Sequence, residues 1–222
     1  MKRFPDMVRR PDSLDDYIIQ EVSCYEHLAI KPGEVVLDVG GNIGSFTRLA
    51  AEAGAARIIA IEPDPSNIEI FKQNMALISG PEIKLIEGAV TSDKAALEKG
   101  TMNLYLNVKK NKGLHSVVET RGREAIEVSA ISWEGIINAY NPHVIKVDIE
   151  GGEYFLNWEM LDRALTPNLR ALAVELHLSK KGWRTGEQQR VLFSIAAAGF
   201  KNVFQMPDTS GKRWTSFYVF QR

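Results

Sequence analysis

The chain has 222 residues, of which 45% are hydrophobic and 25% are charged, and this suits one large globular domain. Its formal net charge of −1 argues against nucleic acid or an acidic membrane as a partner attracted by overall charge. The single cysteine, Cys24, excludes an internal disulfide framework and a cysteine-rich zinc site. No apolar run approaches the roughly 18 residues of a membrane span, and no signal peptide is visible. We therefore expect a cytoplasmic protein with no membrane span and no nucleic-acid partner.

Residues 1–12 alternate arginines with prolines, which disfavour a helix, and we expect them to form a flexible arm. An N-terminal helix is predicted over 13–30, because Ser13 and Asp16 match a capping box and apolar residues follow at helical spacing. This helix could cover a ligand, but packing on a sheet is the favoured interpretation. We expect 13–222 to form a single domain. The apolar face of the helix would consist of Leu14, Tyr17, Ile18, Val22, Tyr25 and Leu28.

The rest of the chain is organised around a strand that runs into a glycine turn. Residues 35–39 are almost entirely apolar and mostly β-branched, which is typical of a parallel strand buried on both faces. Gly40, Gly41 and Gly44 allow the backbone to bend sharply or to approach a ligand. From Ser45 the apolar spacing is helical, and a helix start offers free N–H groups to a polar ligand. The helix would bury Phe46, Leu49, Ala50 and Ala53 and end at Gly54.

The acid within this motif indicates the kind of ligand. The spacing Asp38-x-Gly40-x-x-x-Gly44 differs from the G-x-G-x-x-G pattern of dinucleotide-binding folds, which disfavours an NAD-dependent oxidoreductase. A carboxylate at Asp38 would repel a pyrophosphate but could attract a cationic ligand, directly through charge or through ordered water. S-adenosylmethionine (SAM) carries a sulfonium and an ammonium group and no phosphate.

Two further strands are predicted at 57–61 and 83–86, and each ends in an acidic residue. Glu62, followed by Pro63, lies about 20 residues past the glycines, where a carboxylate can accept both ribose hydroxyls. The alternative for Glu62 is a solvated loop acid. The third strand end could contact the adenine or lie exposed, and it consists of Glu87, Gly88 and Ala89.

Residues 90–143 interrupt the regular alternation and are expected to form an insertion between the third and fourth core strands. Two strand-like runs at 102–106 and 126–131 precede a short helix at 133–140. The polar stretch between the two runs carries three lysines, which favours a solvated loop over a site for an acidic substrate. His115 and Ser116, in the same stretch, are candidate substrate-binding residues on position alone.

A second acid-rich stretch follows a buried strand at 144–147 and contains Asp148, Glu150 and Glu153. Ligands of parallel open sheets bind at the carboxyl ends of the strands, so Asp148 is expected to face the same crevice as Asp38. The acids lack a histidine pair or EF-hand spacing, so we expect no metal. A helix carrying Phe155, Leu156, Met160, Leu161 and Leu165 is predicted next, and Glu153 could cap it.

His177 stands near the end of the next predicted strand, at 169–178, where it could act as a general base or be a rim residue. A helix ending at Gly199 and a hairpin of 203–206 with 214–220 complete the chain. Strand and helix alternate five times before the hairpin. The sequence therefore predicts an α/β protein with a mostly parallel seven-stranded sheet, helices on both faces and a C-terminal antiparallel hairpin, the layout of class I, Rossmann-like methyltransferases.

The motifs over about residues 25–205 resemble the FkbM family of SAM-dependent methyltransferases. They comprise Leu37-Asp38-Val39-Gly40-Gly41-Asn42-Ile43-Gly44, Ile61-Glu62-Pro63, Val174-Glu175-Leu176-His177 and Ala197-Ala198-Gly199-Phe200. The specific part is Lys146-Val147-Asp148-Ile149-Glu150-Gly151-Gly152-Glu153, since the glycine motif alone fits any class I methyltransferase. In this family alanine often stands at Gly41. An acid commonly stands where Trp133 follows the insertion, so the acceptor pocket is expected to differ.

The resemblance implies O-methylation of a sugar or small natural product, with S-adenosylhomocysteine as the second product. Asp148, Glu150 and His177 would border the methyl-transfer site, and any of the three could accept the proton of the hydroxyl. A non-catalytic SAM- or nucleotide-binding protein, and N-methylation or methylation of a protein or nucleic acid, stay open as alternatives, as does a homodimer. The cofactor would contact Asp38, Gly40, Gly41, Asn42, Gly44, Phe46, Glu62, Pro63, Glu87, Gly88, Ala89 and Asp148.

Overall fold

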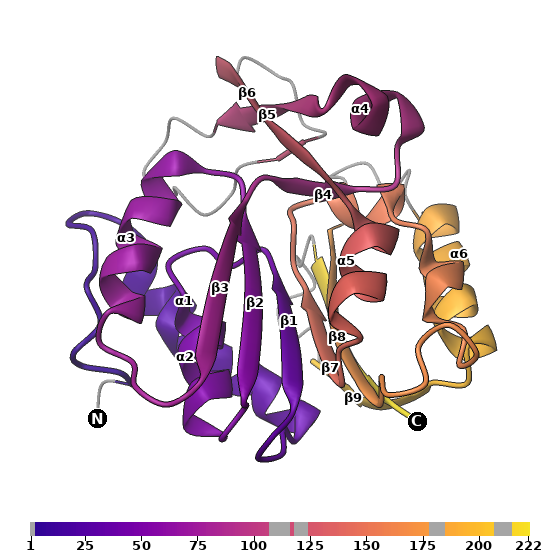
Figure 1. The fold of residues 1–222 in the computed structure, drawn as a ribbon, viewed down its shortest axis with the longest axis horizontal. Coiled ribbons are helices and arrows are strands. Elements are labelled where there is room, and N and C mark those ends of the chain that lie inside the picture. Colours follow the sequence, from indigo (N-terminus) through magenta and orange to yellow (C-terminus); the bar gives the residue numbers. More distant parts are fainter. Residues whose placement is uncertain (1–2, 107–115, 118–123, 178–184, 207–214) are drawn as a thin grey trace.

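The computed structural model describes residues 3–106, 116–117, 124–177, 185–206 and 215–222. Its main sheet has the strand order β3-β2-β1-β7-β8-β10-β9, in which β10 is antiparallel to both neighbours and the other pairs are parallel (Figure 1). The predicted seven-stranded sheet with its C-terminal hairpin is therefore confirmed. The strands of this sheet are β1 (Val35–Val39), β2 (Arg57–Glu62), β3 (Glu82–Glu87), β7 (Val144–Val147), β8 (Ala171–His177), β9 (Lys201–Gln205) and β10 (Thr215–Gln221).

Alternate side chains of the central strands enter two different cores, as the two-residue repeat of a strand requires. In β1, Val36 packs with the N-terminal helices and α2, whereas Leu37 and Val39 pack with α5 and α6. All three side chains have no exposed surface, which explains the continuous apolar run. The helices are α1 (Asp15–Glu21), α2 (Ser45–Glu52), α3 (Pro65–Met75), α4 (Lys94–Lys99), α5 (Trp133–Tyr140) and α6 (Thr185–Ala197).

A second, three-stranded sheet lies above the carboxyl ends of β1, β2 and β3 and was not predicted (Figure 1). It is built from the insertion in the order β4 (Ala89–Thr91), β6 (Glu124–Ser132) and β5 (Thr101–Leu106), with β4 parallel and β5 antiparallel to β6. A Cβ atom at Gly88 would lie 2.7 Å from Ile131 Cγ1 and 2.8 Å from the Ser129 carbonyl oxygen. Gly88 therefore lets β6 cross close to the end of β3.

The N-terminal helix is shorter than predicted, because α1 gives way to a 3-10 helix, η1 (Val22–Leu28). The predicted capping box is also wrong: the Ser13 hydroxyl accepts the amide of Asp15, and Asp16 binds Arg9 at 2.7 Å. Leu14 and Tyr17 are exposed, contrary to the predicted apolar face. Within η1 the buried side chains are spaced by three, as the 3-10 period requires, and are Val22, Tyr25 and Leu28. Ile19 of α1 is buried in the same core.

Residues 3–12, expected as an arm, lie against the domain. Phe4 and Met7 are buried in the same core as α2. The Val8 amide donates to Asn74 Oδ1 of α3 at 2.6 Å, and Arg48 of α2 forms an ion pair with Asp6 at 2.9 Å. This segment thus connects two helices on one face of the sheet.

The helix predicted to follow the second acidic stretch is wrong. Two short 3-10 turns, η2 (Gly152–Phe155) and η3 (Trp158–Leu161), replace it. Between them the chain is extended, because the Phe155 carbonyl accepts the Ser92 amide at 3.1 Å and the Asn157 amide donates to the Ser92 hydroxyl at 2.9 Å. Bonds to Ser92, the residue after β4, therefore take backbone groups that a continuous helix would have used internally.

At the amino ends of β1 and β8, the Glu34 carboxylate accepts two hydrogen bonds from Arg170, at 2.5 and 2.6 Å. Burial alone would raise the pKa of Glu34, but the hydrogen bonds from Arg170 and from the Lys31 amide lower it below its ordinary value. Its contribution to stability is thus present above the unfolded-state pKa of about 4.3 and is lost as pH falls through the lower folded-state pKa.

We expect Glu34→Gln to lower the free energy of unfolding by about 2 kcal/mol at pH 7, and by much less below about pH 3. Denaturant unfolding at both pH values measures this. Glu82→Gln is the matched control, because the Glu82–Arg57 pair is exposed and should contribute about 0–1 kcal/mol. Equal losses in the two variants, or a loss for Glu34→Gln that does not depend on pH, would contradict the assignment.

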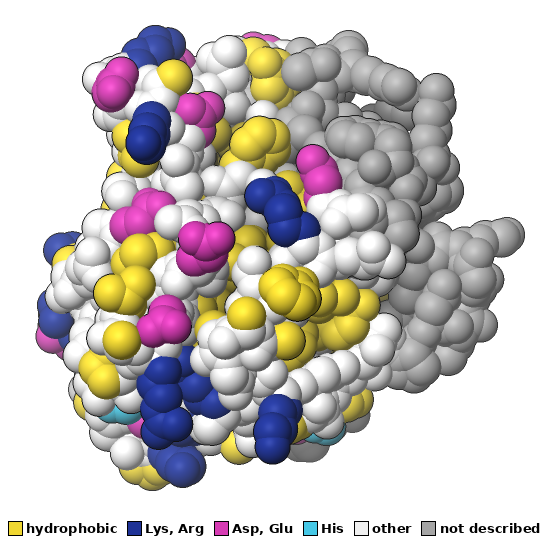
Figure 2. All heavy atoms as spheres, turned by 90° about the vertical axis from the view of Figure 1, so that its right-hand side faces the viewer, with side chains coloured by type: hydrophobic (Ala, Val, Ile, Leu, Met, Phe, Trp, Pro, Cys, Tyr) yellow, Lys and Arg dark blue, Asp and Glu magenta, His cyan; other side chains and the backbone are white. Residues whose placement is uncertain are grey.

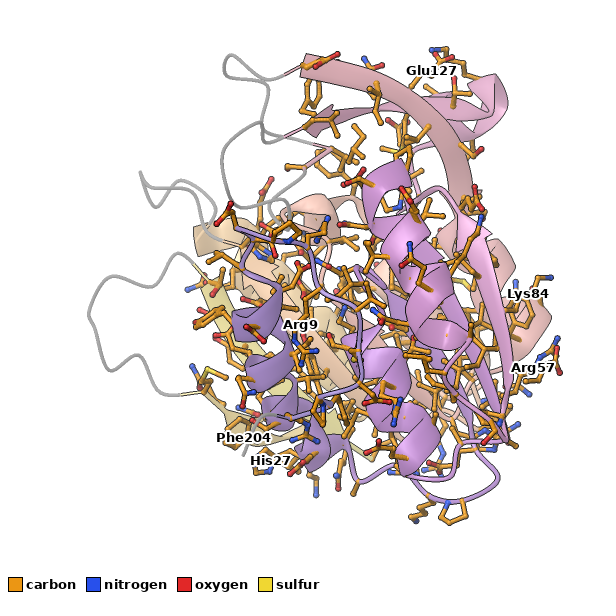
Figure 3. All side chains as sticks on the ribbon, turned by 90° about the vertical axis from the view of Figure 1, so that its left-hand side faces the viewer. Arg9, His27, Arg57, Lys84, Glu127 and Phe204 are labelled. Atoms are coloured by element: carbon orange, nitrogen blue, oxygen red, sulfur yellow. The ribbon has the colours of Figure 1, made fainter. Side chains whose placement is uncertain are left out.

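The described surface does not single out one kind of partner. No helix in the described part of the chain is long and apolar enough to cross a membrane. Figure 2 shows acidic, basic and hydrophobic side chains on the face that carries α6, and none of the three kinds covers it. On the opposite view, Arg57 and Lys84 lie near one another at the edge of the sheet, where their charges are over the Tyr140 ring at 5.2 and 5.4 Å (Figure 3).

Candidate active site at the carboxyl ends of the strands

The glycine turn after β1 closes against both neighbouring strands. The amides of Gly40 and Gly41 donate to the Ile61 carbonyl at 3.0 and 2.9 Å, so the turn is tied to β2. Gly40 has φ of +89°, and a Cβ atom there would lie 1.9 Å from the carbonyl oxygen of Asp148. Gly44 has φ of +90° and begins α2. The predicted strand, turn and helix are confirmed, and the turn has no space for a side chain at Gly40.

Beneath this turn lies a buried ion pair. Asp38 has no exposed surface; it accepts the Thr47 hydroxyl at 2.7 Å and lies 3.3 Å from Lys146 Nζ. Lys146 also donates to the Gly40 carbonyl at 2.5 Å and lies 3.7 Å from Asp148. Burial raises the pKa of Asp38, whereas Lys146 and Thr47 oppose that shift. Asp38 therefore holds the turn through Lys146, and it can act on a ligand only through charge.

Glu62 links the glycine turn to α3. Its Oε2 accepts the Asn42 amide at 2.8 Å, and its Oε1 accepts the Asp64 amide and Asn67 Nδ2, both at 3.0 Å. Asn67 in turn accepts Arg10 Nη1 at 2.7 Å. Since a carboxylate has about four lone-pair sites, these donors leave roughly one for a ligand. Burial raises the pKa of Glu62, and these hydrogen bonds oppose the rise.

The other predicted cofactor contacts differ in their exposure. Glu87 is exposed and pairs with Lys72 at 2.6 Å. Gly88 is buried against β6, Ala89 is buried in β4 of the second sheet, and Pro63 is half-buried. Phe46 is buried in the core, 5.1 Å from the Tyr25 ring.

The three predicted catalytic residues meet where β7 and β8 end. His177 Nε2 lies 3.3 Å from Glu150 Oε2 and 3.9 Å from Asp148 Oδ1. His177 Nδ1 lies 2.9 Å from Glu153 Oε1, and Glu153 has no exposed surface. The other oxygen of Asp148 is 3.4 Å from the Tyr25 hydroxyl. The structure therefore gathers the predicted residues into one cluster and adds Glu153 to it.

Electrostatics within this cluster are dominated by acids. Burial alone would lower the pKa of His177, but the charges of Glu150 and Glu153 raise it well above its ordinary value. Burial raises the pKa of Glu150 to about 8, although His177 lowers it. Burial and the charge of Asp148 raise the pKa of Glu175, on β8, to about 7. All three pKa values are raised, so the cluster holds protons more tightly than the same side chains would in water.

Of the two predicted substrate residues, the structure describes Ser116 and not His115. Ser116 is buried, and its hydroxyl donates to the Glu150 carbonyl at 2.6 Å, which places it against the acidic cluster. His115 lies outside the described residues, as does the lysine-rich stretch before it.

A family model described as "Methyltransferase FkbM domain" matches residues 38–201, which include the glycine turn, Glu62 and the whole acidic cluster. The chain belongs to the FkbM family of SAM-dependent methyltransferases. A relative named "Methyltransferase 1" from Beauveria bassiana is 22% identical over 221 residues, covering 87% of this chain and 84% of the relative. The predicted family and enzyme class are thus confirmed.

Solved structures of other methyltransferases share the fold of this FkbM protein. A precorrin-6y C5,15-methyltransferase from Geobacter metallireducens has a TM-score of 0.52 at 11% identity and covers 99% of this chain and 97% of its own. A ribosomal protein L11 methylase from Lactobacillus delbrueckii subsp. bulgaricus has a TM-score of 0.51 at 14% identity, covering 94% and 80%. At these identities the likeness extends to the fold alone.

Some residues of the FkbM site were missed or given another role from the sequence. Trp133, expected to alter the acceptor pocket, is fully buried in the core, and its indole N–H donates to the Asn157 carbonyl at 3.0 Å. Lys146 was part of the recognised motif, but no role was predicted for it. The position of Lys146 could have indicated that role, because it is a lone lysine inside a buried strand and a buried charge requires a buried partner. Nothing in the sequence indicated a place in the site for Tyr25, because its helical spacing from other apolar residues fits simple packing.

Proposed function

We propose that this FkbM methyltransferase transfers the methyl group of SAM to a hydroxyl oxygen of a sugar or small natural product. The observation that supports it is the placement of the acidic cluster directly beside the glycine turn, with the Asp148 carbonyl against Gly40. A cationic methyl donor and a hydroxyl that loses a proton both suit a group of carboxylates.

The turn has the properties that the methionine and ribose parts of SAM require. Gly40 and Gly44 allow close approach of the backbone, and α2 begins at the turn with free N–H groups. Glu62 keeps capacity for about one ribose hydroxyl. The proposed cofactor contacts are Asp38, Gly40, Gly41, Asn42, Gly44, Phe46, Glu62, Pro63, Glu87, Gly88, Ala89 and Asp148, of which Asp38 and Phe46 act from beneath the surface.

The chain's part in the reaction is orientation and charge placement, because the sulfonium of SAM is already activated. The acceptor oxygen attacks the methyl carbon in line with the C–S bond, which breaks to give S-adenosylhomocysteine. The hydroxyl proton passes to a group of the cluster. Asp148 suits this step better than Glu150 or His177, because the raised pKa values of those two groups favour their protonated forms.

Trideuteromethyl-SAM with a panel of sugars and small hydroxylated natural products tests this function. We expect the gain of one trideuteromethyl group on oxygen, located by mass spectrometry and NMR. Label on nitrogen, on a protein or on RNA would overturn O-methylation of a small molecule and would identify the acceptor class instead. SAM binding with no transfer to any acceptor would instead support a non-catalytic binding protein.

The network behind Glu62 gives a further expected result. Asn67→Ala removes one donor to the Glu62 carboxylate, so we expect the KM for SAM to rise about tenfold with kcat nearly unchanged. Steady-state kinetics at varied SAM concentration measure both constants. Asn103→Ala, an exposed position on β5, is the control and should change neither. A fall in kcat with an unchanged KM would contradict the positioning of Glu62 by Asn67.

A further inference from the structure

Four carboxylates and one histidine converge at the ends of β7 and β8: Asp148, Glu150, Glu153, Glu175 and His177. Within the described part of the chain, these carboxylates form ion pairs only with Lys146 and with His177. Lys146 is shared with Asp38. Four acidic side chains therefore share two cationic neighbours, Lys146 and His177, and a bound cation would offset the repulsion among them.

Three members of the group have the spacing of metal ligands. One oxygen of Asp148, one oxygen of Glu175 and one nitrogen of His177 lie within 4.8 Å of one another. Atoms bound to one metal ion at about 2.0–2.4 Å lie roughly 3–4.5 Å apart, so a small inward movement would suffice. The roles of the Asp148 oxygens are already divided, because Oδ2 faces Lys146 and Tyr25 while Oδ1 faces His177 Nε2 at 3.9 Å.

The buried side chain of Glu153 is a second feature that favours a bound cation. Its Oε1 lies 2.9 Å from His177 Nδ1, which leaves Nε2 directed at the acids. Metal-binding histidines almost always donate their second ring N–H to a carboxylate or carbonyl in this way. Its Oε2 is buried and has no hydrogen-bond partner among the described residues. A buried carboxylate oxygen without a donor is costly, and a dication on His177 would offset its charge.

We propose that Asp148, Glu175 and His177 bind a divalent metal ion, with Glu153 as the positioning residue of His177. A ligand set of two carboxylate oxygens and one imidazole nitrogen suits manganese or a similar first-row ion. It lacks the thiolates of a closed zinc site. The sequence did not predict this site, because its ligands come from two neighbouring strands rather than from one spaced motif. Glu150 lies 3.3 Å from the same nitrogen and would have to give way to the ion.

The use of the ion rests on the proposed O-methylation. Bound to the acceptor oxygen, it would lower the pKa of the hydroxyl. The charge of the ion would favour the ionised form of the displaced Glu150, and the O–H proton would pass to that carboxylate. The new O–CH3 bond would form as the S–CH3 bond breaks, which converts the sulfonium into the neutral sulfur of S-adenosylhomocysteine.

Manganese binding to the chelator-treated full chain, followed by electron paramagnetic resonance in the absence of SAM, tests the site. We expect one Mn²⁺ per chain, with nitrogen coupling from the imidazole in the pulsed spectrum. His177→Gln should abolish that coupling and weaken binding at least about tenfold, and Glu153→Gln should weaken binding about 10- to 100-fold. Glu127→Gln, at an exposed position on β6 that pairs with Lys99 of α4, is the control and should leave binding unchanged (Figure 3).

The possible outcomes separate the metal site from the proposed function. Equal Mn²⁺ binding by the wild-type chain and His177→Gln, or no stoichiometric binding, would overturn the site. Full methyl transfer by the wild-type chain in excess chelator would overturn the catalytic use of the ion but leave the O-methylation standing. Stoichiometric Mn²⁺ binding with no methyl transfer would support the site and count against the proposed function. Circular dichroism of Glu175→Gln, which keeps the side-chain shape, distinguishes lost binding from lost folding.

Discussion

Gly40→Ala is expected to abolish SAM binding and to destabilise the protein. The added Cβ atom would lie 1.9 Å from the Asp148 carbonyl oxygen, and no side-chain rotation can relieve this clash, because the position of a Cβ atom is fixed by its backbone and the oxygen is itself a backbone atom. Either the glycine turn or the end of β7 must move, and both border the proposed cofactor site. A misplacement of about 1 Å can lower the rate at such a site about 100-fold. We therefore expect the SAM affinity measured by calorimetry to fall by at least that factor.

The control for this variant is Gly199→Ala. Gly199 has φ of +86°, close to the +89° of Gly40, but a Cβ atom there would meet nothing within 4 Å. Both substitutions impose the left-handed strain of about 1–2 kcal/mol, so the difference between them isolates the clash. If Gly40→Ala binds SAM as Gly199→Ala does, the close approach of the turn to Asp148 is not part of the site.

Lys146→Met is expected to have the second largest effect. It leaves Asp38, which has no exposed surface, without its positive partner, and it removes the donor to the Gly40 carbonyl. Removing one member of a buried ion pair costs about 3–5 kcal/mol, so the free energy of unfolding should fall by that amount. Methyl transfer should fall about 100-fold, because the turn and Asp148 both lose a contact.

Lys99→Met serves as the comparison. Its partner Glu127 is exposed on the second sheet, so the loss should be about 0–1 kcal/mol and turnover should not change. Denaturant unfolding and the methyl-transfer assay are made on both variants. The double variant Lys146→Met with Asp38→Asn tests the cause: it should recover part of the stability, because the unpaired charge is gone. No recovery would mean that Lys146 acts through packing alone.

Most of the sheet could be predicted because its strands are buried on both faces. The segments 35–39, 57–61 and 144–147 are short apolar runs followed by glycines or acids, and each forms the expected strand. The helix at 133–140 was predicted with its observed bounds, since Ser132 caps its start and Asn141 ends it in the left-handed region. Local capping and periodicity were sufficient in these places.

Contacts between distant segments decided the parts that were not predicted. The turns η2 and η3 exist because Ser92 of a remote segment binds residues 155 and 157, which no local pattern shows. The second sheet forms through pairing of β4 with β6, some forty residues later in the chain. The acids of the site were identified from the sequence, but the partners of Asp38 and Glu153 depend on how neighbouring strands meet.

Titration calorimetry of SAM against NAD is the most direct test of the central claim, that the glycine turn binds a methyl donor. We predict micromolar SAM binding and no NAD signal in the wild-type chain. Glu62→Ala should lose the SAM signal, whereas Glu82→Gln, at the far end of the neighbouring strand, should retain it. NAD binding, or SAM binding that survives Glu62→Ala unchanged, would contradict the account.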